Sequence, residues 1–206
     1  MLIVGAGLKM MLRKIRSLVS NSDYFGIYDN ALSKKECEII INQFEKSEQG
    51  PGRLWRNGII QEVPAYKKCR TLNDTHFDDG SIITNITRLQ LVKCLERYDH
   101  EQPQLREVGR WGLYQGYSIQ KYETEDDGYK DWHAEAGGSG PTSERILAWT
   151  FYLNNAKSGT EFMNYPTVRA KMGRCVIWPA GWTHVHRGAP NKGLKYIVTG
   201  WISYLE

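Results

Sequence analysis

The sequence has few of the features that mark secreted, membrane-spanning or nucleic-acid-binding proteins. Its cysteines form no C-x-x-C pair and have no histidine at zinc-finger spacing; they are Cys37, Cys69, Cys94 and Cys175. No apolar run approaches the ~20 residues that a membrane helix needs. The 27 basic and 23 acidic residues leave a formal net charge of only +4, which does not argue for nucleic acid. We therefore expect reduced, buried thiols in a cytoplasmic protein without a membrane span.

The first residues, MLIVGAGLKMMLRKIRSLVS, differ from the rest of the chain. An apolar start precedes a basic run from Lys9 to Arg16, which is the reverse of the charge order in a secretory signal. A basic amphipathic helix on a membrane or partner is one interpretation. A poorly ordered tail or an upstream start is the other, which we favour. We assign residues 1–19 to this extension and residues 20–206 to one domain, since the length suits a single core.

Two helices are predicted in the first half of this domain. Ser33 followed by Glu36 is a capping-box pattern, and the apolar spacing beyond it predicts a helix from about Lys34 to Ser47. A second helix is predicted from about Gly80 to Asp99. Its apolar stripe would comprise Ile82, Ile83, Ile86, Leu89, Leu91, Val92 and Leu95. Residues 24–28 resemble a short strand, and residues 53–77 are expected to be irregular, with a strand near 58–63.

From Gly109 onward, short alternating or apolar segments are separated by turn residues. These segments predict strands at about 110–122, 129–134, 145–153, 160–163, 166–171, 174–178, 183–187 and 194–204. Short strands preceded by helices predict a mainly β fold with N-terminal helices, a double-stranded β-helix of the jelly-roll or cupin-like type. Helical support would span about 20–108 and the jelly-roll core about 109–206.

His133 and Glu135 are candidates for one metal site, because side chains two apart on a strand point to the same face. A second predicted strand carries His184 and His186. Two imidazoles and one carboxylate leave coordination positions open, as in iron(II) oxygenases, whereas a structural zinc site would need a fourth ligand. Lys195 then stands in an otherwise apolar strand, where a bound dicarboxylate would compensate its buried charge.

An ordered set of motifs extends from about residue 122 to residue 201. It comprises Trp132-His133-Ala134-Glu135, Phe151-Tyr152-Leu153-Asn154, Gly159-Thr160-Glu161-Phe162, Gly173-Arg174 to Trp178-Pro179, His186-Arg187-Gly188-Ala189-Pro190 and Lys195-Tyr196 to Trp201. As a set, these motifs resemble the 2-oxoglutarate- and Fe(II)-dependent dioxygenases. The resemblance is to the prolyl 4-hydroxylase-like branch, in forms encoded by phages and marine bacteria.

The resemblance implies that His133, Glu135 and His186 bind Fe(II). The family spacing to Pro190 and Lys195 selects His186 over His184. Glu135 departs from the commoner motif, which has Asp at this position, and the longer side chain must fold back to hold the metal.

The resemblance also implies a cosubstrate site. Lys195 would bind the distal carboxylate of 2-oxoglutarate, helped by the Tyr152 hydroxyl, and Tyr122 and Thr160 would contact or line the same pocket. Trp201 falls at an aromatic position of the family, although core packing explains it at least as well.

The implied activity is hydroxylation of a C–H bond with release of succinate and CO2, using O2 and 2-oxoglutarate, with ascorbate as reductant. A peptidyl proline is the expected substrate, and a free amino acid or small metabolite is the alternative. Nucleic acid is not expected, because dealkylases of this superfamily carry Arg where Lys195 and Trp201 stand. The acidic segment 122–140 would form a loop at the pocket mouth and favour a basic or neutral peptide. A non-catalytic cupin-like metal- or ligand-binding protein is a further alternative.

Overall fold

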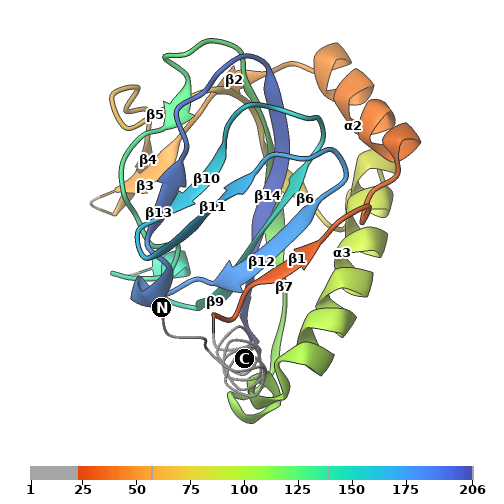
Figure 1. Ribbon diagram of the computed structural model, residues 1–206, viewed down its shortest axis with the longest axis vertical. Coiled ribbons are helices and arrows are strands. Elements are labelled where there is room, and N and C mark those ends of the chain that lie inside the picture. Colours follow the sequence, from red (N-terminus) through yellow and green to blue (C-terminus); the bar gives the residue numbers. More distant parts are fainter. Residues whose placement is uncertain (1–22, 57, 139, 206) are drawn as a thin grey trace, which may run out of the picture.

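Two antiparallel sheets and two helices make up most of the chain that the computed structural model describes, residues 23–56, 58–138 and 140–205 (Figure 1). No helix in this part is long and apolar enough to cross a membrane. The predicted N-terminal extension, residues 1–19, lies outside the described residues, and the division of the chain at residue 20 stays a prediction.

The larger sheet has seven strands, and each neighbouring pair is antiparallel. Their spatial order is β1 (Gly26–Tyr28), β12 (Cys175–Pro179), β9 (Arg145–Tyr152), β14 (Lys195–Tyr204), β7 (Trp111–Tyr122), β6 (Arg70–His76) and β2 (Gly50–Pro51). The smaller sheet has the order β11 (Tyr165–Arg169), β10 (Gly159–Phe162) and β13 (His186–Gly188). This mainly β arrangement is consistent with the predicted jelly roll.

Smaller elements complete the described fold. Two short strand pairs are β3 (Leu54–Arg56) with β4 (Ile59–Gln61), and β5 (Lys67–Lys68) with β8 (Gly128–Tyr129). The 3-10 turns are η1 (Pro103–Glu107), η2 (Gly140–Thr142) and η3 (Trp182–His184). The helices α2 (Lys34–Lys46) and α3 (Ile82–Glu101) lie along one side of the larger sheet (Figure 1).

Helix α2 begins and ends close to where the sequence predicts. Its capping box is present: the Glu36 N–H donates to Ser33 Oγ at 3.3 Å, and the Ser33 N–H donates to Glu36 Oε2 at 2.7 Å. The helix buries Cys37, Ile40 and Phe44 against the sheet. The capping pattern and the apolar spacing therefore predicted this element correctly.

Helix α3 buries only part of the predicted apolar stripe: Ile83, Leu91 and Leu95 are buried as predicted, and three other members of the stripe are not. Ile82 and Leu89 are each 55% exposed and Val92 is 38% exposed. The buried residues are Ile83, Thr84, Thr87, Leu91, Cys94, Leu95 and Tyr98. Apolar residues occur on more than one face of this helix, so their spacing alone did not select the face that meets the sheet. Burial of Thr84 is compensated, because its hydroxyl lies 2.6 Å from that of Tyr117.

Strand alternation divides the interior into two cores. Along β14, Tyr196, Val198 and Ile202 join the core beneath the helices. The alternate residues Lys195 and Thr199 point into the space between the two sheets, where they line a cavity. The polar side chains of the candidate site are thus held on the inner face of a strand whose other face packs in the main core.

Three strand predictions need correction. Only Gly128–Tyr129 of the predicted strand at 129–134 pairs as β8, and His133 instead forms an isolated bridge with His186. In the predicted strand at 183–187, His184 ends η3 and the strand begins at His186. Strand β6 lies in a region expected to be irregular. The other predicted strands are present within two residues of their predicted bounds.

Candidate active site

Three potential metal ligands converge at the open side of the space between the sheets: His133, Glu135 and His186. One ligand atom of each lies within 4.8 Å of the other two. The Nε2 atoms of His133 and His186 lie 3.6 Å and 3.4 Å from Glu135 Oε1. Metal bonds of about 2.1 Å at right angles place neighbouring donors roughly 3 Å apart. The two histidine–glutamate separations therefore need to shorten by only a few tenths of an ångström around an ion.

Backbone pairing holds the two histidines together. The N–H of His133 donates to the carbonyl of His186 at 2.9 Å, and the N–H of His186 returns the bond at 2.9 Å. His133 and Glu135 were expected to lie on the same face of one strand. Instead, His133 forms an isolated antiparallel bridge with His186. This bridge still directs both imidazoles and the carboxylate to one point.

Backbone carbonyls fix the protonation of both imidazole rings. Nδ1 of His133 lies 2.9 Å from the carbonyl oxygen of Asp131, and Nδ1 of His186 lies 2.8 Å from that of His184. A carbonyl oxygen only accepts, so each Nδ1 carries the proton. The Nε2 lone pairs then face Glu135 Oε1, which is the arrangement that metal-binding histidines require. The donor set fits a divalent metal.

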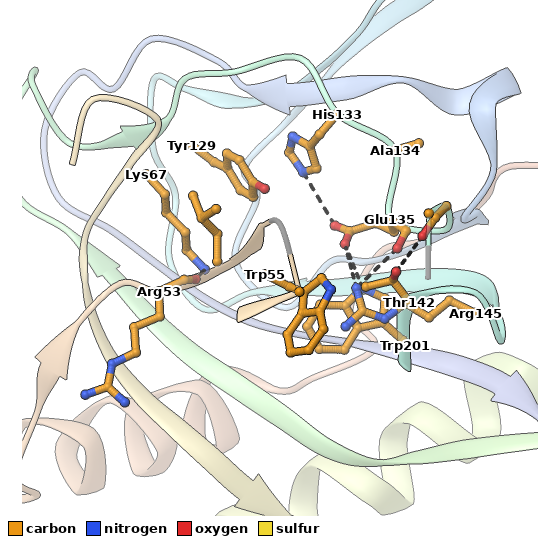
Figure 2. A pocket seen from close by; sticks show the side chains of 14 residues that line it. Arg53, Trp55, Lys67, Tyr129, His133, Ala134, Glu135, Thr142, Arg145 and Trp201 are labelled. Carbon is orange, nitrogen blue, oxygen red and sulfur yellow. Dashed lines mark hydrogen bonds and ion pairs between the residues drawn. The ribbon is translucent and has the colours of Figure 1, made fainter. Parts of the chain in front are cut away.

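Glu135 is anchored on the side away from the histidines. Its Oε2 accepts a hydrogen bond from the indole Nε1 of Trp201 at 2.8 Å. Arg145 Nη1 donates to the Glu135 carbonyl at 3.2 Å, and its guanidinium lies 3.6 Å from the centroid of the Trp201 ring (Figure 2). Burial raises the pKa of the Glu135 carboxyl, but His133 and His186, when their Nε2 atoms carry protons, outweigh burial and hold it well below its usual value. A metal cation would take the place of those protons. The Glu135 side chain is one methylene longer than an Asp, and its hydrogen bond from Trp201 holds the extra length in place.

A cavity of about 90 Å³ adjoins the metal cluster and brings together the predicted cosubstrate residues Lys195, Tyr152, Tyr122 and Thr160. Lys195 is 3% exposed, and its Nζ lies 4.5 Å from the centroid of the Tyr122 ring. Burial lowers the Lys195 pKa to about 8, and no carboxylate of the described residues pairs with its ammonium. The cavity therefore contains an uncompensated cation.

Hydroxyl groups line the same cavity. The Tyr152 hydroxyl lies 2.7 Å from Thr160 Oγ1, and the Tyr122 hydroxyl donates to Gln120 Oε1 at 2.5 Å. Burial raises the pKa of Tyr152 to about 12 and that of Tyr122 well above its usual value. Both phenols therefore stay protonated near neutral pH. Tyr122 uses its one hydroxyl proton in the bond to Gln120, whereas the Tyr152–Thr160 pair shares two hydroxyl protons and keeps one of them to donate to an anion.

His184 takes no part in the cluster. Its Nε2 lies 2.8 Å from the carbonyl oxygen of Asp23, and its ring is stacked on Tyr165 at a centroid distance of 5.0 Å. Both ring nitrogens are occupied, because Nδ1 lies 2.9 Å from the Thr183 hydroxyl. His76 and His100 are exposed, as expected. Of the two competing histidines, the geometry thus brings His186 to the cluster.

The contact of Trp201 with Glu135 was not anticipated. Sequence reasoning regarded core packing as at least as good an explanation of this residue. A usable signal was present, because Lys195, Ile197, Thr199 and Trp201 alternate along one strand and share the face that lines the cavity.

Sequence comparison identifies part of the chain. Residues 117–203 match the model of the 2OG-Fe(II) oxygenase superfamily. No curated protein gives a significant match.

Solved prolyl hydroxylases share the fold. A prolyl hydroxylase from Trichoplax adhaerens, in complex with a peptide fragment of the hypoxia inducible factor oxygen degradation domain, is 15% identical with a TM-score of 0.68, covering 94% of this chain and 92% of that one. The viral collagen prolyl hydroxylase of Paramecium Bursaria Chlorella virus-1, as a 2OG complex, is 16% identical with a TM-score of 0.65, over 88% and 97%. A Pseudomonas putida prolyl-4-hydroxylase is 13% identical with a TM-score of 0.61, over 88% and 93%.

At these identities the structural likeness establishes the fold alone, and the sequence match covers the strands that carry the cluster. The region from residue 117 to residue 203 is thus similar in sequence to the 2OG-Fe(II) oxygenase superfamily, within a fold that this chain shares with prolyl hydroxylases.

Proposed function

We propose that this protein is an Fe(II)- and 2-oxoglutarate-dependent dioxygenase that hydroxylates a C–H bond, and that its substrate is a proline residue of a peptide or protein. One observation carries the proposal. The cavity that contains the three-ligand cluster also contains a buried, uncompensated cation, Lys195. A metal-only binding protein would have no use for that cation.

In this proposal His133, Glu135 and His186 would hold Fe(II) through Nε2, Oε1 and Nε2, a set of two imidazoles and one carboxylate that leaves coordination positions for other ligands. Bound Fe(II), with 2-oxoglutarate and O2, supplies oxidation of a C–H bond coupled to release of succinate and CO2, and we expect ascorbate to serve as reductant. The protein contributes the fixed tautomers, the anchored carboxylate and the enclosure of the site.

The second part of the site is the proposed anion pocket. The Lys195 ammonium gives a charge-assisted hydrogen bond to the distal carboxylate of 2-oxoglutarate. The Tyr152 and Thr160 hydroxyls are bonded to each other, so the one of them that accepts in that bond adds a neutral hydrogen bond to the carboxylate. Folding already buries the Lys195 ammonium at an unfavourable free energy, because the charge has no anionic partner. A bound carboxylate supplies that partner without further desolvation of the lysine. The Tyr122 ring lies against the ammonium and orients it.

Aromatic rings cover the histidines and exclude water. Tyr129 is stacked on His133, with ring centroids 3.6 Å apart and planes at 13°. Trp178 and Phe162 lie 5.1 Å and 5.4 Å from His186 between ring centroids. Such walls protect a reactive centre from side reactions with solvent.

A peptide substrate is supported by the shape of the approach to the cluster. An open cleft of about 600 Å³ reaches His133 and Glu135 and is lined by Trp55, Tyr129 and Trp201. Aromatic surfaces of this kind suit an extended, proline-containing segment. The Trichoplax adhaerens relative is described in complex with a peptide, which supports the same class of substrate.

The decisive experiment measures succinate formed by the purified full chain with Fe(II), ascorbate and 2-oxoglutarate, alone and with a peptide library. Succinate should form slowly without peptide, and mass spectrometry should find peptides that gain one oxygen at proline. His133→Ala should abolish both signals, and His76→Ala, an exposed histidine, should leave them unchanged. Oxygen gain on free amino acids alone would move the substrate to that class. Metal binding without succinate would indicate a non-catalytic metal-binding protein.

A further inference from the structure

The cleft beside the metal cluster is lined by three basic side chains and one acidic one. The basic residues are Arg53, Lys67 and Arg145, and the acidic residue is Glu135. Neither Glu135 oxygen is available to a substrate, because Oε1 faces the histidines and Oε2 accepts from Trp201. The described lining therefore presents positive charge to whatever enters.

The two arginines already have acidic neighbours. Arg53 Nε lies 3.8 Å from a carboxylate oxygen of Glu62, and Arg145 Nη1 lies 3.5 Å from Glu135 Oε2. Lys67 differs from them: its Nζ donates to the backbone carbonyl of Arg53 at 3.1 Å, and no carboxylate of the described residues forms an ion pair with it. A neutral carbonyl stabilises an ammonium less than an anion does.

Lys67 is both buried and close to the reacting centre. The residue is only 9% exposed, and its Nζ lies 5.6 Å from the centroid of the Tyr129 ring. Because Tyr129 is stacked on His133, a single aromatic ring separates this ammonium from a metal-ligand candidate. Figure 2 shows the Lys67 side chain beneath Tyr129, extending toward the part of the cleft between Arg53 and Trp55. Lys67 lines the large cleft and the cosubstrate cavity alike.

The acidic loop does not offset this charge. Asp126 lies 2.6 Å from Lys68 Nζ and 2.5 Å from Lys130 Nζ. Asp127 Oδ2 accepts from the backbone N–H groups of Glu123 and Thr124 at 2.7 Å and 3.0 Å. These two carboxylates are used within the fold, and neither forms an ion pair with Lys67.

We infer that Lys67 recognises a carboxylate that the substrate carries next to the carbon to be oxidised, an inference that rests on the proposed function. A carboxylate entering the cleft gives this buried ammonium a charge-assisted hydrogen bond, which is stronger than its bond to the neutral Arg53 carbonyl. The carboxylate can come from two sources: an acidic side chain beside the target residue of a peptide, or the α-carboxylate of a free amino acid. The substrate is thus anionic at this point in either case.

The test is a binding measurement that needs no turnover. The full chain is loaded with Mn(II) and 2-oxoglutarate, and calorimetry compares blocked peptides that differ only in a Glu-Pro, Gln-Pro or Lys-Pro step. The Glu-Pro peptide should bind about tenfold more tightly than the Gln-Pro peptide, the usual size of a hydrogen bond to a charged group. The Lys-Pro peptide should bind more weakly than either. A preference for L-proline over L-prolinamide, with no discrimination among the peptides, would assign the α-carboxylate as the source.

Variants connect the preference to the side chain. The Glu-Pro to Gln-Pro affinity ratio should fall to about one in Lys67→Met and persist in Lys67→Arg, with the exposed Lys35→Met as matched control. The ratio is taken within each variant, so a loss of folded protein does not change it.

Two outcomes overturn the inference. One is equal affinity of the parent protein for Glu-Pro and Gln-Pro together with equal affinity for L-proline and L-prolinamide. The other is a Lys67→Met protein that keeps the Glu-Pro over Gln-Pro preference, whatever its affinity for 2-oxoglutarate. Failure of the hydroxylase assay is a separate result, because binding is measured without succinate formation.

Discussion

Trp201 and Glu135 are joined by a hydrogen bond of 2.8 Å from the indole Nε1 to Oε2, while Oε1 of the same carboxylate lies 3.4 Å and 3.6 Å from two imidazole nitrogens. One oxygen is thus directed at the candidate metal position and the other is held by the protein. Groups that hydrogen-bond to metal ligands set their orientation and affinity. Trp201 therefore controls where the Glu135 carboxylate lies.

Removing the indole donor should weaken metal binding. Trp201→Phe keeps an aromatic ring against Arg145 but leaves Oε2 without its hydrogen bond from Trp201, and we expect affinity for Co(II) to fall about tenfold. The measurement is a titration followed by the visible absorption of bound Co(II). Trp182→Phe is the matched control, because Trp182 is 83% exposed. Equal Co(II) affinity of Trp201→Phe and the parent protein would refute the assigned role.

Shortening the carboxylate should reveal the coupling between the two residues. Glu135→Asp is one methylene too short to reach both the histidines and Trp201, so it should also bind Co(II) more weakly. Because Asp has already lost contact with the indole, Trp201→Phe should cost little in that background. A double-mutant cycle on Co(II) affinity measures the difference. Strictly additive losses would show that the two side chains act independently.

Affinity for 2-oxoglutarate should depend on pH through Lys195. The Lys195 pKa of about 8 in the free protein means that the ammonium is lost as pH rises above that value. Binding of a dicarboxylate requires the charged form, so the dissociation constant for 2-oxoglutarate should increase between pH 7 and pH 9. Lys195→Arg should bind without this dependence, because arginine stays charged, and Lys195→Met should bind poorly throughout. Calorimetry with Mn(II) measures each constant, and a pH-independent parent protein would contradict the assignment.

The same buried amine should affect folding. Its pKa falls from the ordinary 10.5 to about 8 on folding, so the unfolded chain binds more protons between these values. The free energy of unfolding of the ligand-free protein should therefore gain a contribution that grows as pH rises from about 8 to about 10.5. Urea unfolding of the parent and Lys195→Met compares the two slopes. The contribution should be absent from the variant, and identical slopes would argue against a depressed pKa.

Gly159 should be intolerant of a side chain. A Cβ built there would lie 2.0 Å from the carbonyl oxygen of Val168 on the neighbouring strand. Gly159→Ala should destabilise the protein by about 1–3 kcal/mol through overpacking and displace Thr160 next to it in the cosubstrate cavity. Gly181→Ala is the control, since its Cβ would meet nothing within 4 Å and its φ of −79° suits alanine. Thermal unfolding compares the two, and equal melting temperatures would contradict the packing argument.

The candidate cluster could be predicted because chemistry restricts which residues bind metal. His133, Glu135 and His186 were named from residue type and spacing, and they converge. His184 was excluded by the family spacing, and the physical reason emerged only in three dimensions, where the Asp23 carbonyl and the Thr183 hydroxyl occupy its ring nitrogens.

What could not be predicted depended on long-range packing. The buried face of α3 includes Thr84 and Thr87 while Ile82 is exposed, because the sheet decides which face of the helix it covers. Strand β6 has the polar sequence RTLNDTH and forms by pairing with β7. Lys67 carried no local signal either, because its position depends on the pairing of β5 with β8.

The reciprocal 2.9 Å bonds between the backbones of His133 and His186 have a consequence for how an ion would be acquired. A multidentate ligand gains affinity when its donors need not be gathered from separate parts of a mobile chain, because the loop-closure entropy has been met beforehand. In this protein, main-chain hydrogen bonds hold the two histidines together before the ion binds, so folding has already reduced the chain entropy. A side-chain substitution does not remove these bonds directly. Loss of the ion should leave the frame intact, so repeated loading and stripping of the metal should proceed without refolding.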